Sequence, residues 1–584
     1  MTRSLAHFSI TQASSMELSQ STTTLTSATS KNGRKNTTTL RIRSTLSVCC
    51  LIILGGLLSW VTPVKALGSV DIPKPKVSPT THHTNAVHLS CRAVAAFALL
   101  QSNMKKSSNK QEGHAFAIRM LDQDPAFLRL VGRDRAFSRL LLSTSERRAG
   151  QIGKVIQSFV RKPTAETNQS SSKKTRPSDA LCDAALRIGA SQLLFLETPT
   201  YAAVSETVEI LRMHPKIKVS KSQISFVNAV LRKMSQEGKE KLKETSVLDN
   251  IDPWIANQWI ETYGKNTTET MVQAAMSQSP IFLTVNHWQS PDKLKLVRDA
   301  FSSEVDSNSS SSKESVAEIL PIGSIRVPAT LRGSVSNWPL YEDGVWWVQD
   351  PSATLPAIAL FKSLQRIKEG GAESMHVVDL CSAPGGKCAQ LCSMGFGRID
   401  AIEISKTRSR SLRQNLRRLG METSCNVTVQ DGRTWIPNNA DDASNTVDGI
   451  LVDAPCSATG LGSRRPDVLR KKIDLEELVT VQRELLAHAV DNVLKPGGVV
   501  VFATCSLLKQ EGEHQVEWLL SRQRGGTGSN SVAKVETEPF LPGEIAGFDD
   551  CIDKNGWLRV LPGTLPGALK HCDGFFVARL KRIE

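Results

Sequence analysis

The sequence predicts a multidomain protein: an N-terminal all-α bundle, a small α+β linking domain and a C-terminal doubly wound α/β domain. Its 584 residues correspond to about three to four domains of roughly 150 residues each. Apolar residues recur at helical spacing over residues 85–245, whereas strand-like apolar runs alternate with helical segments over 349–584. Residues 250–348 mix the two patterns, as expected for a small linking domain.

The first 84 residues are expected to be a targeting segment and a linker. Residues 1–66 are rich in Ser and Thr and contain a single acidic residue, Glu17. They include an apolar run at 48–61. That run is shorter than the roughly 20 residues of a membrane span, and Val64-Lys65-Ala66 resembles a cleavage site. These features predict import into an organelle, a plastid rather than a mitochondrion, followed by removal of the segment and no lasting membrane association. A retained N-terminal anchor is the alternative.

Charge and cysteine usage narrow the class of protein. The net charge of +15 favours a polyanionic partner such as a nucleic acid. The twelve cysteines are dispersed without a CxxC pair, which argues against a disulfide scaffold and for a reducing compartment. Cys388 and Cys392 are one helical turn apart, but no second ligand pair follows them, so no metal site is expected. The protein is expected to act as a monomer.

Several segments of residues 85–245 carry apolar residues three and four positions apart, so each predicts a helix with one buried stripe. Packed together, such helices form a bundle. Two polar stretches read as surface insertions. The predicted helical segments are 93–100, 186–196, 203–211 and 226–232, and the predicted insertions are 103–113 and 163–178. In the linking domain we expect an amphipathic helix at 254–260, a strand at 281–285 and a Ser-rich loop at 302–315.

Five strands are predicted in the C-terminal domain, at 376–380, 398–404, 426–430, 447–453 and 499–504. Polar residues fall at or just past the ends of these strands: Asp379, Glu403, Asp431, Asp453 and Cys505. Ligands of doubly wound sheets bind beyond the carboxyl ends of the strands. The sequence therefore predicts that these side chains share one site.

A glycine-rich turn, Ala383-Pro384-Gly385-Gly386-Lys387, follows the first of these strands and opens a helix. Glycine lets a ligand approach the backbone, and a helix start offers free N–H groups to a carboxylate. The turn lacks the spacing of GxGxxG and GxxxxGK[ST], which disfavours NAD and ATP. Glu403 is placed to bind ribose hydroxyls and Asp431 to meet an adenine amino group; a helix cap and a turn aspartate are their alternatives.

Two cysteines adjoin neighbouring strand ends: Cys456 in Asp-Ala-Pro-Cys and Cys505 in Thr-Cys-Ser. Proline stiffens the first loop and would hold Asp453 and Cys456 in place. A thiolate is a strong nucleophile. Either cysteine alone would be read as a buried core thiol. Together, beside an aspartate and a cofactor loop, they indicate attack of sulfur on a substrate next to a bound cofactor.

The motifs DLCSAPGGK, DGR, VDAPCSATG, RRPD, LKPGG, ATCS and CDGFF closely resemble those of the RNA cytosine-5 methyltransferases. The helical region, with 203–209 and 226–232, resembles the antitermination factor NusB, and YEDG…VQD also fits. The combination resembles the NusB-fused, bacterial-type small-subunit (16S) ribosomal RNA cytosine-C5 methyltransferases of the Sun/Fmu family from about residue 85 onward. The resemblance implies a NusB-like RNA-binding domain at 85–245, a small α+β domain at 250–348 and a Rossmann-like methyltransferase domain at 349–584.

The resemblance also implies S-adenosylmethionine as cofactor, RNA as partner and a role for each site residue. Cys505 would attack C6 of a cytosine in small-subunit ribosomal RNA, Asp453 would bind the base edge, and Cys456 would assist release of the 5-methylcytosine product. Glu403 stands where the family usually has aspartate. The implied cofactor contacts are Cys381, Ser382, Ala383, Pro384, Gly385, Gly386, Lys387, Glu403, Arg408, Asp431 and Asp453. A transfer RNA cytosine-5 methyltransferase and a non-catalytic RNA-binding or ribosome-assembly factor are the alternatives.

Two basic features are candidates for contacts with RNA phosphates. The helix at 405–419 carries six basic residues and is either RNA-facing or simply solvated. Arg464 and Arg465, beside the loop of Cys456, are the stronger candidates. The target base must leave its stack to reach Cys505, so an unpaired or locally melted segment is the expected substrate.

Overall fold

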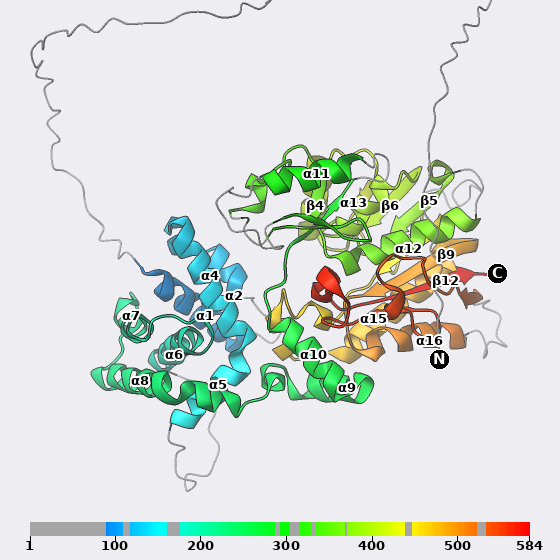
Figure 1. The fold of residues 1–584 in the computed structure, drawn as a ribbon. Helices are drawn as coiled ribbons and strands as arrows, with labels where there is room; N and C mark the ends of the chain where they lie inside the picture. The colour runs from blue at the N-terminus through cyan, green and yellow to red at the C-terminus, as the bar shows by residue number, and fades with distance from the viewer. Residues whose placement is uncertain are drawn as a thin grey trace, which may run out of the picture. The chain divides into compact units, whose positions relative to one another are not determined.

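The computed structural model describes residues 89–108, 117–160, 176–286, 292–303, 316–328, 331, 333–367, 371–437, 447–522 and 533–583 (Figure 1). The predicted targeting segment, including the apolar run at 48–61, lies outside these residues. Within the described ranges, none of the helices combines the length and the apolar character needed to span a bilayer.

The N-terminal region is a helical bundle in which α6 (Pro177–Phe195) packs against five other helices (Figure 1). Leu181, Ala184 and Ile188 of α6 are fully buried, as the helical spacing of its apolar residues predicts. Its neighbours are α1 (Cys91–Ser108), α4 (Gly132–Arg147), α5 (Ala149–Phe159), α7 (Thr200–Met213) and α8 (Lys221–Lys243), with the short α2 (Ala117–Asp122) and α3 (Pro125–Arg129) beside α1 and α4.

The four predicted helical segments of the bundle are confirmed: they lie within α1, α6, α7 and α8, except that Leu196 is the cap residue just past the end of α6. The predicted insertions are too wide. Residues 103–108 continue α1, and residues 177–178 begin α6. The first turn of α6 accepts Pro177 because the N–H groups there have no partner within the helix. The rest of the two stretches, apart from Arg176, lies outside the described residues.

In the described residues, the linking region contains three α-helices and a small antiparallel sheet. Helices α9 (Pro253–Tyr263) and α10 (Lys265–Ala275) precede strands β1 (Phe282–Val285), β2 (Glu318–Ile319), β3 (Ile325–Arg326) and β4 (Trp346–Val348), arranged in the order β2-β3-β1-β4. Trp346 is fully buried and meets the ring of Phe301 edge-on at 5.6 Å. The predicted helix and strand are confirmed. Helices α10 and α11 (Asp292–Ser303) were not predicted, and α11 includes the first two residues of the predicted loop.

The C-terminal sheet has the strand order β10-β12-β9-β8-β5-β6-β7. Its five parallel strands are the five predicted ones: β5 (His376–Asp379), β6 (Arg398–Ile402), β7 (Asn426–Thr428), β8 (Val447–Asp453) and β9 (Leu494–Thr504). Three antiparallel strands, which were not predicted, complete it: β10 (Val535–Thr537), β11 (Leu558–Val560) and β12 (Phe575–Arg582). The doubly wound α/β fold is confirmed, and the sheet is mixed.

Helices cover both faces of this sheet, which explains why its parallel strands are continuous apolar runs. Val377 packs in the core that includes α12 (Pro351–Ile367), α13 (Gly386–Ser393) and α14 (Lys406–Arg418). Its neighbour Val378 packs in the opposite core, with α15 (Leu475–His488) and α16 (Glu513–Ser521). Strand β5 pairs with both β6 and β8, so the chain reverses direction across the sheet at this point, where ligands of such folds bind.

Candidate active site

One cavity of about 410 Å³ opens beside the carboxyl ends of β5, β6, β8 and β9. The strand register explains why: Asp379 pairs with Leu451 and Asp453 with Ala503, so the ends of β5, β8 and β9 lie side by side. Apolar side chains such as Leu380, Ile404 and Leu485 form part of its wall. The predicted site residues that line the cavity are Cys381, Glu403, Arg408, Asp431, Asp453, Cys456 and Cys505.

The remaining predicted cofactor residues, Ser382 to Lys387, form the turn after β5 and the first two residues of α13, and they are not among the residues that line the cavity. The hydroxyl of Ser382 donates to the carbonyl of Asp379 at 2.7 Å. Gly385 caps α13 with φ of 111°, and a Cβ there would lie 2.7 Å from Leu412 Cδ1. Only glycine fits both that backbone conformation and that space. Lys387 at the end of this turn pairs with Asp453, which lines the cavity, so the turn lies directly beside the cavity.

Two carboxylates of the cavity are held by arginines. Glu403 accepts a hydrogen bond from the backbone N–H of Ser405 at 2.8 Å and pairs with Arg408 at 3.3 Å. Arg408 also donates to the carbonyl of Ala383, which ties α14 to the glycine-rich loop. Asp431 pairs with Arg433 at 2.6 Å, and this hydrogen bond lowers the pKa of Asp431. Such oriented carboxylates are suited to accept hydrogen bonds from hydroxyl and amino groups of a ligand.

Asp453 is paired with Lys387, whose Nζ lies 2.7 Å from Oδ2 and over the ring of Phe575 at 5.1 Å. Burial by itself would lower the pKa of Lys387, but Asp453 and the other acidic groups around it together raise that pKa. The lysine therefore carries a positive charge between the glycine-rich loop and the cysteine loop. The side chain of Asp453 remains 29% exposed, so it can still contact a substrate.

Asp379 lies beneath the cavity with no cation bound to it. Its Oδ1 accepts one long hydrogen bond, 3.4 Å, from the N–H of Cys381, and Oδ2 has no partner among the described residues. Burial, and next the charge of Asp453, raise the pKa of Asp379 to about 8. The carboxyl group is therefore mostly protonated at neutral pH, as expected for a buried acid without a counter-ion.

We expect Asp379 to make the protein less stable at alkaline pH. The folded chain holds a proton on Asp379 that an unfolded aspartate, with a pKa of 3.8, releases. This stabilisation is complete below pH 3.8 and is lost as the pH rises through about 8. Asp379→Asn should remove this loss, so its melting temperature should fall less than that of the wild type between about pH 6 and about pH 9. If the melting temperatures of the two proteins fall equally over this pH range, Asp379 does not hold the extra proton in the folded state.

The two predicted catalytic cysteines lie together at the cavity. Their Sγ atoms are 3.4 Å apart, within hydrogen-bond distance for sulfur. The hydrogen bond to Cys505, together with burial, raises the pKa of Cys456 well above that of a free thiol. Cys456 is therefore expected to stay protonated and to donate its S–H to Cys505, and such a donor stabilises a thiolate.

A buried carboxylate that was not predicted from the sequence, Glu511, joins the two cysteine loops from below. Its Oε1 accepts hydrogen bonds from the N–H of Ser457 at 2.8 Å and from Gln482 at 3.1 Å. Its Oε2 accepts from the hydroxyls of Ser457 and Ser506. Ser457 follows Cys456 and Ser506 follows Cys505, so one carboxylate fixes the residue after each thiol. The only signal in the sequence that could have pointed to Glu511 is its position six residues after Cys505.

Gly460 brings the same two loops into direct backbone contact. Its N–H donates to the carbonyl of Cys505 at 2.9 Å. A Cβ at position 460 would lie 2.8 Å from that oxygen and 2.2 Å from the carbonyl oxygen of Gly574. Any larger residue would push the loop of Cys456 away from Cys505.

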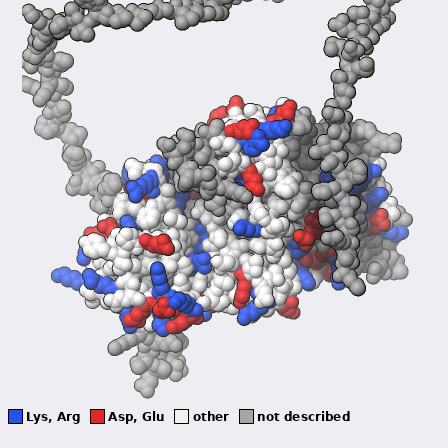
Figure 2. All heavy atoms as spheres, in the orientation of Figure 1, with Lys and Arg blue, Asp and Glu red and all other residues white. Residues whose placement is uncertain are grey.

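The expected phosphate contacts near the site are largely bonded within the protein. Arg464 binds Asp350 at 2.5 Å and Asp573 at 2.8 Å, and Arg465 binds Asp467 at 2.9 Å. Arg464 thus links two distant segments of this chain, and its charge is already compensated by two carboxylates. The prediction that Arg464 binds RNA phosphates is therefore corrected. Four basic residues of α14 also form ion pairs or hydrogen bonds with other groups of the protein: Arg408, Arg413, Arg417 and Arg418. Figure 2 shows basic and acidic side chains interspersed over the face in view.

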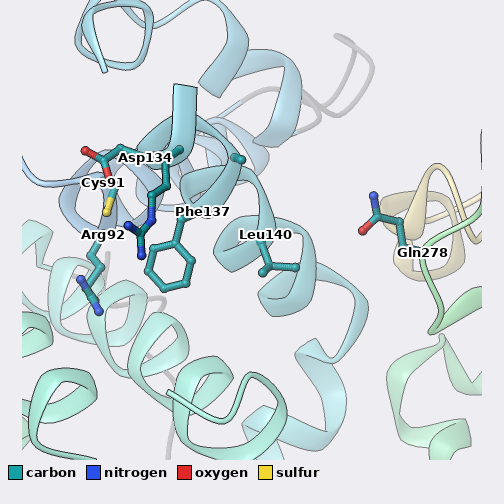
Figure 3. A pocket seen from close by; sticks show the side chains of 8 residues that line it. Cys91, Arg92, Asp134, Phe137, Leu140 and Gln278 are labelled. Atoms are coloured by element: carbon teal, nitrogen blue, oxygen red, sulfur yellow. The ribbon is translucent and has the colours of Figure 1, made fainter. Parts of the chain in front are cut away.

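A further cavity lies on the helical bundle, away from the predicted chemistry. Figure 3 shows Arg92, Asp134 and Phe137 around it. Arg92 donates to Gln192 at 2.7 Å and lies over the ring of Phe137 at 5.1 Å. None of the sequence-predicted site residues lines this cavity, so the chemistry is assigned to the cavity at the sheet.

Two family models match separate parts of the chain. The model described as 16S rRNA methyltransferase RsmB/F matches residues 370–581, and the NusB family model matches residues 90–236. These ranges contain the sheet with its cavity and most of the helical bundle.

Curated relatives match most of the chain. A protein named ribosomal RNA small subunit methyltransferase B from an Enterobacter species is 30% identical over 408 residues, which cover 68% of this chain and 81% of the relative. Its namesake from Shewanella oneidensis is 30% identical over 401 residues, with coverage of 68% and 81%. The crystal structure of PH0851 superposes with a TM-score of 0.58 at 19% identity over 84% of this chain and 99% of that protein, a likeness of fold.

Proposed function

Since this chain belongs to the RsmB/F family of 16S ribosomal RNA methyltransferases, with a fused NusB-family domain, we propose that it methylates cytosine C5 in small-subunit ribosomal RNA through a bond between Cys505 and C6 of the base. S-adenosylmethionine is the cofactor of this methyltransferase. The observation that carries the proposal is the pair of thiols 3.4 Å apart at a cavity also lined by Glu403, Asp431 and Asp453.

The residues of the cavity fit S-adenosylmethionine. When bound, the cofactor supplies an electrophilic methyl group on a positively charged sulfur. Glu403 and Asp431 would bind its ribose hydroxyls and adenine amino group, and Leu380, Ile404 and Leu485 provide apolar surface for a ring. The glycine-rich loop and the start of α13 supply backbone N–H groups for its carboxylate.

Replacing Glu403 by glutamine should weaken S-adenosylmethionine binding by about tenfold, since the loss of a charged hydrogen bond costs about 1.5 kcal/mol or more. Calorimetric titration measures this directly. Glu422→Gln is the matched control, because Glu422 forms only an exposed ion pair with Arg417 next to α14. Equal dissociation constants for the Glu403 and Glu422 variants would exclude Glu403 from the cofactor site.

In the proposed reaction the thiolate of Cys505 adds to C6, and its electron pair makes C5 nucleophilic. Asp453, oriented by Lys387, accepts a hydrogen bond from the amino group of the base and so holds the base edge in position. C5 then takes the methyl group. Loss of the C5 proton returns an electron pair to the ring, the C6–sulfur bond breaks, and Cys505 leaves as a thiolate. Cys456, within hydrogen-bond distance of that sulfur, assists this release.

A mechanism-based trap tests both the position of methylation and the covalent step. In ribosomal RNA fragments that contain 5-fluorocytidine, C5 carries fluorine in place of the departing proton, so elimination cannot occur. With S-adenosylmethionine present, the enzyme should remain bound to this RNA on a denaturing gel, whereas cytidine RNA should turn over. Methylation of cytidine RNA without any adduct on the fluorinated RNA would refute the C6 attack.

We also propose that residues 1–84 direct the protein into an organelle, with a plastid as the destination. The support is compositional: an acid-poor, Ser/Thr-rich lead and an apolar run at 48–61. A fluorescent reporter fused to residues 1–84 should enter plastids and lose the segment near Ala66. The same fusion without residues 48–61 is the control. A cytosolic or mitochondrial reporter would contradict the proposed destination.

A further inference from the structure

Three thiols meet in the core beside the glycine-rich loop. The Sγ atoms of Cys388, Cys392 and Cys425 all lie within 4.8 Å of one another, and those of Cys388 and Cys425 are 3.4 Å apart. All three side chains are buried. Cys388 and Cys392 share one face of α13 because they are four residues apart, and Cys425 directly precedes β7. No second ligand pair follows Cys388 and Cys392 in the sequence, but the fold brings Cys425 to them as a third thiol.

We propose that Cys388, Cys392 and Cys425 bind a soft, thiolate-preferring metal ion. Thiolates bind such an ion at about 2.3 Å, which places sulfurs that share it roughly 3.8–4.0 Å apart. The Cys388–Cys425 separation of 3.4 Å is slightly shorter than this value and no pair exceeds 4.8 Å, so small side-chain adjustments complete the site. Each thiol that binds the ion releases its proton.

The set of ligands indicates which ions fit. Within the described residues, no fourth Cys, His, Asp or Glu belongs to this group. The three thiols lie in an apolar core with residues such as Leu391 and Leu412. Structural zinc prefers four ligands in a tetrahedron, whereas thiolates select monovalent copper. Three-coordinate binding of a copper(I)-type ion is therefore favoured over zinc.

An ion at this site would fasten two segments of the proposed cofactor site. Helix α13 starts at the cap residue Gly385 of the glycine-rich loop, and β7 leads into the segment of Asp431. The ion would hold these segments together without touching the reacting atoms. Its loss should therefore lower the melting temperature and loosen S-adenosylmethionine binding, with no metal step in methyl transfer.

The test is metal analysis of the full chain, purified without chelators under anaerobic conditions. Copper and zinc are measured by mass spectrometry before and after addition of copper(I) from a bicinchoninate complex or of zinc chloride. We expect stoichiometric uptake, a higher melting temperature, and loss of both in Cys388→Ala and Cys425→Ala. Cys551→Ala is the matched control, since Cys551 is buried outside the cluster.

X-ray absorption of the loaded wild-type protein keeps the proposal testable if the variants fail to fold. Three sulfur ligands around copper would support the proposed copper(I) site. Three sulfur ligands and one further ligand around zinc would also support the site, but with zinc as its ion. The proposal is overturned if the wild type takes up neither ion, if Cys388 and Cys425 are joined in a disulfide, or if Cys551→Ala loses the ion equally. S-adenosylmethionine binding and methyl transfer, measured separately, report on the proposed function.

Discussion

Cys505→Ala should lower the rate of methyl transfer by at least about 10⁴-fold, as the removal of other enzymatic nucleophiles does. The affinity for S-adenosylmethionine should stay unchanged. The thiol supplies the bond to C6, without which C5 of cytosine is too weak a nucleophile, and the carboxylates that line the cavity remain in place. Transfer of labelled methyl groups to RNA measures the first effect, and calorimetry measures the second.

Cys456→Ala should have a different signature, because Cys456 is proposed to act after the methyl group has been transferred. The protein–RNA bond should form and persist, so a complex with unmodified cytidine RNA should survive denaturing electrophoresis. Cys182→Ala is the control for loss of a thiol, since Cys182 is buried in the helical bundle. Normal turnover by Cys505→Ala, or an adduct that forms in Cys505→Ala and not in Cys456→Ala, would reverse the assigned roles.

Glu511→Gln should lower kcat by about 10- to 100-fold with little change in the affinity for S-adenosylmethionine. A glutamine has the same shape but turns one acceptor oxygen into a donor, which faces the N–H and hydroxyl groups of Ser457 and Ser506. Losing hydrogen bonds to a charged acceptor costs about 1.5–3 kcal/mol, and the two cysteine loops are no longer held in register.

The rate of adduct formation with fluorinated RNA separates a positioning role from general destabilisation, since it reports on the placement of Cys505. Glu517→Gln is the matched control, because Glu517 is an exposed glutamate on α16. If Glu511→Gln keeps the wild-type rate of adduct formation, the carboxylate does not position the thiols. A parallel loss of cofactor affinity would instead indicate that the whole cavity has collapsed.

Residues that act at strand ends could be located from the sequence because strand ends are local features. The apolar run at 447–453 and the Asp-Ala-Pro-Cys loop after it predict a strand and a polar residue at its edge, and the structure ends β8 at Asp453. The short strands β10 and β11 and the longer β12 could not be found in this way. They exist because they pair with β9 or with one another, and their own residues carry little alternation.

The helical bundle, the alternating α/β region and the residues that meet at one edge of its sheet were all predictable from the amino-acid sequence. These depend on periodicity and on motifs that lie within a few residues of each other. Three contacts became visible only in the folded chain: Arg464 pairs with Asp350 and Asp573, Glu511 joins the two cysteine loops, and Cys425 reaches Cys388. Each of these contacts unites distant segments, and the partner of a buried charge or thiol is set by the packing of strands and helices, which local pattern does not encode.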